Sequence, residues 1–167
     1  MSSTDPAPLP DVAAILGSLL ARVPREHQPL LIALAERMAA RRYREWARDP
    51  AGAPNASGLL ACAEREDDIA SRVEGLYPNA AELQRAVLAT SPDLEDINRT
   101  IFAARPLAQQ FLIQAGGERL GAATWRAFAS EGHDPHRRDV LLACAVLEEA
   151  NADVLEVILG TSHVSVR

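Results

Sequence analysis

The stretch LPDVAAILGSLLARVPREHQPLLIALAERMAARRYREWA (residues 9–47) is matched by a second stretch, SPDLEDINRTIFAARPLAQQFLIQAGGERLGAATWRAFA (residues 91–129). The same register, an offset of 82 residues, continues without an insertion until LLACAERED (59–67) falls on LLACAVLEE (141–149). The matched pairs include Pro10/Pro92, Asp11/Asp93, Pro24/Pro106, Gln28/Gln110, Glu36/Glu118, Arg44/Arg126, Cys62/Cys144 and Glu66/Glu148. A constant offset over so long a span indicates a tandem duplication of residues 10–77 as residues 92–159. We therefore expect two similar helical units related by an approximate two-fold axis.

The composition favours a single all-α domain. The chain has 167 residues, of which 48% are hydrophobic and only 4% aromatic. This length allows one domain with a substantial core, and the abundance of Ala and Leu favours helices over strands. We predict a helical bundle of six main helices, three from each repeat.

Charge and hydropathy exclude two classes of partner. The net charge is −6, whereas nucleic-acid-binding domains usually carry a basic surface. No apolar run approaches the ~20 residues of a membrane-spanning helix, and the amino terminus does not resemble a secretory signal. Cys62 and Cys144 occupy matching repeat positions, as expected for small, buried and reduced thiols. We therefore expect a cytoplasmic protein that binds neither nucleic acid nor membranes.

Prolines, glycines and capping residues divide the chain into segments. We expect a flexible tail over 1–9, one domain over 10–159 and a C-terminal tail over 160–167. The predicted helices span 10–22, 25–48 and 57–75 in the first repeat, 93–104, 106–130 and 138–159 in the second, and 79–90 in a link between them.

Two glutamates project from apolar faces of the predicted helices. At about 100° per residue, Glu66 and Glu148 each lie in the middle of an otherwise apolar stripe. An ionised carboxylate in such a place costs several kcal/mol unless it is paired, hydrogen-bonded, metal-bound or protonated. Glu36 and Glu118 form a second matched pair near the middle of helices 25–48 and 106–130. These four glutamates are the candidate site.

Four mid-helix glutamates on two hairpins joined by a longer connection resemble the ferritin-like di-iron carboxylate bundles. In that superfamily one helix of each hairpin supplies a Glu and the other supplies Glu-x-x-His. The resemblance implies that Glu36 and Glu118 are the lone glutamates and that Glu66 and Glu148 begin the Glu-x-x-His pairs. It further implies an iron or manganese site with an oxidase-type or iron-handling activity.

The chain departs from this pattern at both histidines. Ile69 and Asn151 stand three residues after Glu66 and Glu148, where the superfamily has His. The resemblance is thus to a divergent member whose ligands are carboxylates only, or carboxylates assisted by Asn.

A structural role is the other interpretation of the same glutamates. Arg42 lies in the apolar seam of helix 25–48, and antiparallel packing would bring it level with Glu66. This arrangement predicts a partly buried Arg42–Glu66 ion pair. Thr124 replaces Arg42 in the second repeat, so Glu148 would need Thr124, Asn151 or a glutamine such as Gln110 or Gln114 as its partner.

Two further features of the sequence leave alternatives open. Arg37, Arg41, Arg44 and Arg48 follow one outward side of helix 25–48 and predict either a solvated face or a surface for an acidic partner. Gly116-Gly117 interrupts helix 106–130 at a cost of about 1 kcal/mol each relative to Ala. These glycines indicate either close helix packing or a kink that opens a pocket beside Glu118.

No nucleophile elbow, phosphate-binding glycine loop or Cys-x-x-Cys motif occurs in the chain. We therefore predict a non-catalytic binding or assembly protein that acts through its helical surfaces and self-associates, as a homodimer, or binds a protein partner, without a cofactor. The alternative is the carboxylate metalloprotein, with iron or manganese held by Glu36, Glu66, Glu118 and Glu148.

Overall fold

The computed structural model describes residues 8–164, with side chains described as far as residue 160. This part of the chain is all-helical, with seven α-helices, two short 3-10 turns and no strand. The α-helices are α1 (Val12–Leu20), α2 (Gln28–Arg48), α3 (Ala56–Glu74), α4 (Ala80–Thr90), α5 (Leu94–Phe102), α6 (Leu107–Ala129) and α7 (Pro135–Val164). None of the helices in residues 8–164 is both long and apolar enough to cross a membrane.

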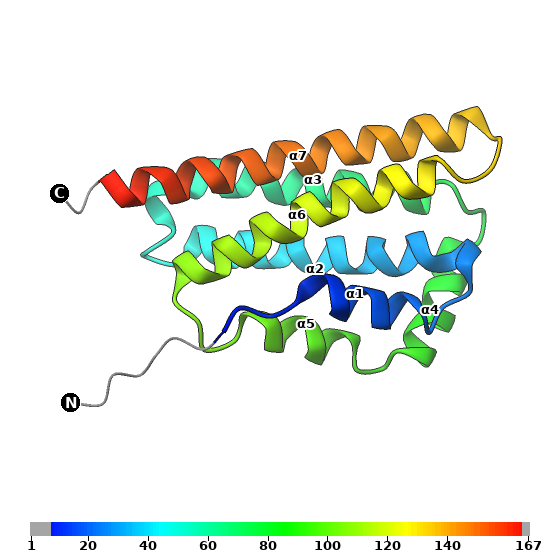
Figure 1. Ribbon diagram of the computed structural model, residues 1–167, viewed down its shortest axis with the longest axis horizontal. Coiled ribbons are helices and arrows are strands. Elements are labelled where there is room, and N and C mark those ends of the chain that lie inside the picture. Colours follow the sequence, from blue (N-terminus) through cyan, green and yellow to red (C-terminus); the bar gives the residue numbers. More distant parts are fainter. Residues whose placement is uncertain (1–7, 165–167) are drawn as a thin grey trace.

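The four long helices form two antiparallel hairpins that pack into a bundle. Helix α2 packs along α3, and helix α6 packs along α7 (Figure 1). The two hairpins contact each other through α3 and α7. Arg25, just before α2, pairs with Glu131, just after α6, so α2 and α6 also run in opposite directions. The prediction of an all-α helical bundle is therefore confirmed for the described residues.

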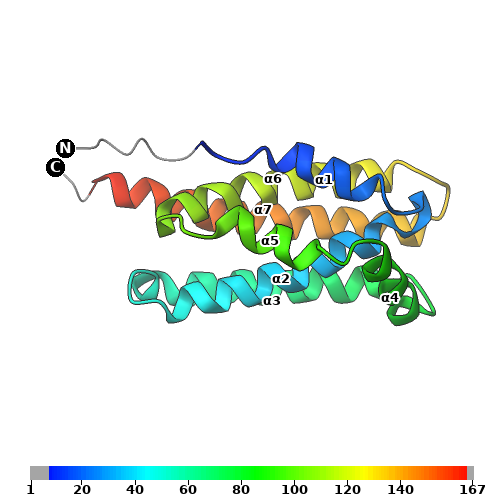
Figure 2. The same ribbon diagram turned by 90° about the horizontal axis from the view of Figure 1, so that it is seen from below.

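The shorter helices cover one side of this bundle. Helix α1 packs on α6 and helix α5 packs on α2, so each short helix lies against the hairpin that belongs to the other half of the chain. Both lie below the bundle in the view of Figure 1 and over the α2 and α6 side in Figure 2. Helix α4 packs against α2 at one end and carries the chain from the first hairpin to α5.

Local sequence explains where several helices begin. The Asp11 carboxylate accepts the backbone N–H of Ala14 at 3.0 Å, which caps α1. Pro106 cannot donate a backbone N–H and directly precedes α6. Pro135 begins α7, a position that does not need the N–H, after Gly132 turns the chain at a φ of 80°.

The helix bounds agree with the predicted segments to within a few residues, except at the end of the chain. Helix α5 begins and ends 82 residues after α1. Helix α7 starts earlier than expected, at Pro135, and continues to Val164 through part of the segment predicted as a tail. Residues 1–7 of the predicted N-terminal tail and residues 165–167 lie outside the described residues.

Two apolar clusters fill the interior at the two ends of the long helices. One contains Trp125, Ile69 and Leu141, and the other contains Tyr43, Leu59 and Leu155. Along each long helix, one glutamate falls between residues of the first cluster and residues of the second. The candidate site is therefore a polar layer between two apolar layers.

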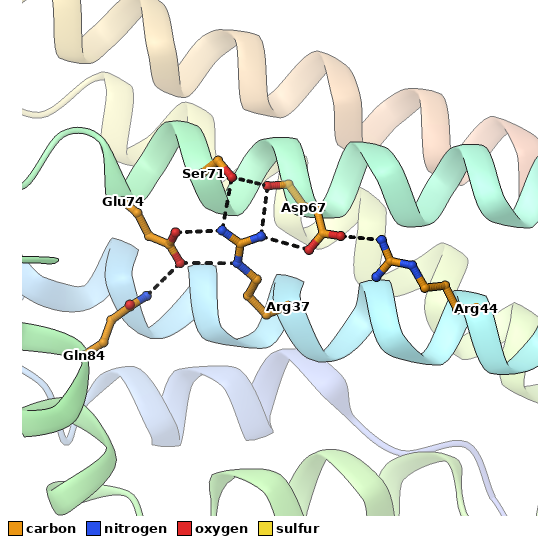
Figure 3. A network of polar contacts seen from close by, with 6 residues as sticks. All are labelled: Arg37, Arg44, Asp67, Ser71, Glu74 and Gln84. Carbon is orange, nitrogen blue, oxygen red and sulfur yellow. Dashed lines mark hydrogen bonds and ion pairs between the residues drawn. The ribbon is translucent and has the colours of Figure 1, made fainter. Parts of the chain in front are cut away.

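The arginine face of α2 is occupied by acids of the same chain. Arg37 pairs with Asp67 at 2.9 Å and with Glu74 at 2.7 Å, and Arg44 also pairs with Asp67 (Figure 3). Gln84 of α4 donates to Glu74, so the network joins α2, α3 and α4. An intramolecular ion-pair face thus accounts for Arg37 and Arg44 without an acidic partner.

Candidate metal centre

The structure brings all four predicted glutamates into the bundle core. Glu36, Glu66, Glu118 and Glu148 lie on α2, α3, α6 and α7, with side chains exposed by only 8%, 0%, 1% and 1%. Each long helix therefore contributes one carboxyl group to the same buried layer.

The carboxyl groups converge closely. One carboxylate oxygen of Glu36, one of Glu66 and one of Glu148 all lie within 4.8 Å of one another. Glu118 lies near enough to Glu66 and Glu148 for its charge to raise the pKa of each of these groups. Groups of one charge sign can lie this close only if protons or a cation neutralise them.

Four side-chain donors hold the carboxyl groups in place. Oε1 of Glu118 accepts from the Tyr43 hydroxyl at 2.6 Å and from the Gln114 amide at 2.7 Å. The Trp125 indole N–H donates to Oε1 of Glu148 at 2.7 Å. Oε1 of Glu66 has its own donor, the Asn151 amide, at 2.8 Å.

Two carboxylate oxygens of the layer have no hydrogen-bond donor. Oε2 of Glu66 and Oε2 of Glu118 are buried and lack a hydrogen-bond partner. A buried oxygen without a partner costs about 1–3 kcal/mol, and more when it is charged. These two oxygens are therefore available as ligands for a cation.

The predicted Arg42–Glu66 ion pair is absent from the described residues. Arg42 instead donates to Asn98 at 2.6 Å and to Gln114 at 2.8 Å, and its guanidinium stacks on Phe102. The pair prediction is wrong because Arg42 points across to α5 and α6 rather than along its own hairpin. Its charge still favours ionised carboxylates nearby, although burial lowers the pKa of Arg42 to about 10.

The Asn151 side chain hydrogen-bonds a glutamate of the opposite hairpin. It occupies the position of the second missing histidine, and its amide bonds Glu66 of α3 rather than Glu148 on its own helix. The partner of Glu148 is Trp125, which the sequence interpretation did not consider as a donor. The available signal was that Tyr43 and Trp125 are 82 residues apart and each follows a site glutamate by seven residues.

Burial raises the pKa of three carboxyl groups of the cluster, which favours their protonated forms. Burial raises the pKa of Glu36 to about 7, although contacts with Glu66 and Glu148 partly lower it. Burial also raises the pKa of Glu66 well above its usual value, and the charges of Glu118 and Glu36 add to the rise. The pKa of Glu148 is raised well above its usual value, first by burial and then by the other three carboxylates.

Two glycines of α6 make room beside the cluster. A Cβ at Gly121 would lie 2.6 Å from Oε1 of Glu148, so only glycine leaves this carboxyl group where it is. A Cβ at Gly116 or Gly117 would meet nothing within 4 Å, which argues against close helix packing there. Gly117 and Glu118 instead line a cavity of about 130 Å³ between the α2 and α6 walls and the covering helices α1 and α5.

The donor set suits a hard or intermediate metal ion. Carboxylate oxygens favour Mn²⁺, Mg²⁺, Ca²⁺ and iron over the softer ions that select thiolates. Cys62 and Cys144 are free thiols, and burial raises the pKa of each to about 12, which keeps them protonated. The arrangement can therefore bind one or two cations through oxygen alone.

Comparison with protein-family models, with curated proteins and with solved structures found no match for this chain. The chemistry of the site must therefore be inferred from its own geometry.

Proposed function

We propose that this protein binds iron or manganese through Glu36, Glu66, Glu118 and Glu148, as a carboxylate-only metalloprotein. The observation that carries the proposal is the convergence of three buried carboxylate oxygens within 4.8 Å of one another. No arginine or histidine forms an ion pair with any of the four carboxyl groups in residues 8–160. A bound cation would replace the protons that otherwise neutralise the cluster.

The arrangement of helices supports a ferritin-like origin of this centre. One glutamate from each helix of two antiparallel hairpins, joined by a longer connection, is the ligand plan of the di-iron bundles. The 82-residue offset between α1 and α5, and between each pair of glutamates, supports a duplicated hairpin unit. On this proposal the chain is a divergent member in which Ile69 and Asn151 replace the histidines.

Such a centre would bind one metal ion or two. Paired metals in carboxylate sites lie about 3.5–4 Å apart. Oε2 of Glu66 and Oε2 of Glu118 lie on helices of different hairpins and have no other partner, so these two residues would be among those that hold the metal. When bound, iron or manganese would supply redox or iron-storage chemistry, while the protein supplies burial and fixed ligands.

Metal analysis after purification without chelators tests the proposal. We expect one or two equivalents of iron or manganese in the wild-type protein, and loss of most of this metal in Glu66→Gln. Glu64→Gln is the matched control, because Glu64 lies on the same helix but is exposed. Wild-type protein that stays metal-free after incubation with Fe²⁺ or Mn²⁺ would contradict the proposal.

A second candidate function is assembly through helix α7, as expected for a binding protein or homodimer. Leu142 and Val146 are four residues apart on one face of α7 and keep 41% and 60% of their surface exposed. Apolar side chains that share an exposed face favour association with another protein surface. Light scattering of wild-type protein and of Val146→Asp tests this function, with a dimer expected only for the wild type.

A further inference from the structure

The cavity beside the carboxylates is almost entirely apolar. Its volume is about 130 Å³, and helices α1, α2, α5 and α6 all contribute aliphatic side chains. These include Ile15, Leu19, Leu31, Ile97, Ile101 and Ile113. An apolar cavity of this kind holds water poorly, because water inside it finds few hydrogen-bond partners.

The cavity reaches both the carboxylates and the outside of the bundle. Glu36, Glu118 and Glu148 line it, and Glu148 comes from α7, on the far side of the bundle from α1 and α5 (Figure 1). Glu66 does not line the cavity and is fully buried, whereas Glu36 is the most exposed of the four at 8%. Three of the four site glutamates therefore line the inner part of this cavity.

The covering helices leave this space accessible. Ala35, Gly117 and Gly121 lie in the middle of long helices and face the cavity, yet each is only partly buried. Helices α1 and α5 therefore leave these wall positions partly exposed. A small molecule could enter on this side without unfolding the four-helix core.

We propose that this cavity is a binding site for a small, uncharged, apolar molecule of about the size of benzene or toluene. Its volume is close to that of an engineered apolar cavity of about 150 Å³ that stays dry and binds benzene. An anionic ligand is disfavoured because it would enter beside three buried carboxyl groups. Arg42 also lines the cavity, but Asn98, Gln114 and Phe102 already occupy its guanidinium.

Binding of an apolar molecule in this cavity does not require the metal. A role of the cavity in holding a substrate beside the metal rests on the proposed function, because the glutamates that line the cavity are the proposed metal ligands.

Toluene binding to the metal-free protein tests the site separately from metal binding. The adjacent glycines provide matched variants, because an added Cβ at either position meets nothing within 4 Å but only Gly117 lines the cavity. We expect titration calorimetry and backbone amide NMR shifts around the cavity to show saturable toluene binding by the wild type and by Gly116→Leu. Gly117→Leu should weaken this binding at least tenfold, because its side chain fills the cavity.

Ala35→Leu fills the same space from α2 and replaces Gly117→Leu if that variant does not fold. Benzoate, with nearly the same shape as toluene, should not bind. The proposal is overturned if wild-type protein does not bind toluene, if the filled variants bind it as tightly as the wild type, or if benzoate binds more tightly than toluene. Metal content measured on the same variants shows separately whether the metal centre fails.

Discussion

Glu66 and Asp67 are consecutive residues of α3 with opposite surroundings. Glu66 points into the core, where it meets other carboxyl groups and the neutral amide of Asn151. Asp67 points outward, where Arg37 and Arg44 both pair with it (Figure 3). The carboxyl group of Glu66 thus has no cationic partner in the described residues, whereas the carboxylate of Asp67 has two.

This difference is visible in the proton affinity of the two groups. Burial raises the pKa of Glu66, and neighbouring carboxylates raise it further. Partial burial also acts to raise the pKa of Asp67, but hydrogen bonds from Arg44 and Arg37 outweigh it and lower that pKa. Surface pairs of this kind contribute about 0–1 kcal/mol each, so Asp67 adds only modestly to the stability of the fold. Glu66 has no ion-pair partner in the described residues, and on the proposed function a bound metal ion takes that place.

The largest expected effect comes from supplying the missing cation. Adding Mn²⁺ or anaerobic Fe²⁺ to metal-free protein at pH 7.5 should stabilise it by about 4 kcal/mol when the free metal is about 1,000 times the Kd. Thermal unfolding should then shift upward by about 8–16 °C, and a chelator should reverse the shift. Mn²⁺ should raise the unfolding temperature of Glu66→Gln by only a small fraction of this amount.

The next effect is the pH dependence of the metal-free protein. A carboxyl group with a raised pKa in the folded state stabilises the fold below its unfolded pKa, and this stability is lost as the pH rises through the folded pKa. The pKa of Glu36 rises from 4.5 to about 7, so the free energy of unfolding should fall by about 3 kcal/mol between pH 4.5 and pH 8. Urea unfolding across this range measures the change.

Asp67 should show the opposite behaviour in a different pH window. Its lowered pKa contributes stability above its unfolded pKa, which is lost only as the pH falls through the folded value. A metal-free protein whose stability rose steadily from pH 5 to pH 8 would show that the core carboxyl groups are not protonated as described.

Neutral substitutions at the two consecutive residues should have effects of opposite sign. Glu66→Gln removes a group that is costly to ionise, so metal-free protein at pH 8 should gain about 1–3 kcal/mol. Asp67→Asn removes two surface ion pairs and should lose less than about 1 kcal/mol, with no loss of bound metal. Urea unfolding together with metal analysis compares the two variants.

The smallest expected effect tests the placement of Glu148. Gly121→Ala would bring a Cβ within 2.6 Å of Oε1 of Glu148, so the carboxyl group must move and metal affinity should fall about tenfold. Gly116→Ala is the control on the same helix. It should leave the affinity unchanged and stabilise the protein by up to about 1 kcal/mol. Equal metal affinity in the two variants would show that the position of Glu148 is unimportant.

Much of the local structure could be predicted from the residues themselves. The positions of Pro24, Pro106 and Pro135 limit the helices because proline is excluded from a helix interior. The end of α7 could not be predicted, because Gly160 ends many helices but here the helix continues to Val164. Helical periodicity identified Glu66 and Glu148 as inward-facing, the repeat register added Glu36 and Glu118, and all four are buried.

The contacts within the site depend on tertiary packing. Periodicity shows which face of a helix is buried but not which helix lies opposite, and so the Arg42–Glu66 pair was predicted within one hairpin. In the structure Arg42 reaches α5 and α6, Tyr43 reaches Glu118, and Asn151 reaches Glu66, each across to the other half of the chain.

The sequence alone determined that the chain is helical, that its halves share an 82-residue register, and that Glu66 and Glu148 lie on apolar helix faces. These are local properties, set by side-chain periodicity and backbone preference. Only the tertiary structure decided that the carboxyl groups of Glu36, Glu66 and Glu148 converge, that arginine pairs with Asp67 rather than with them, and that a largely apolar cavity lies beside the site. Those are properties of how helices cross in space, which depends on packing between residues far apart in the chain.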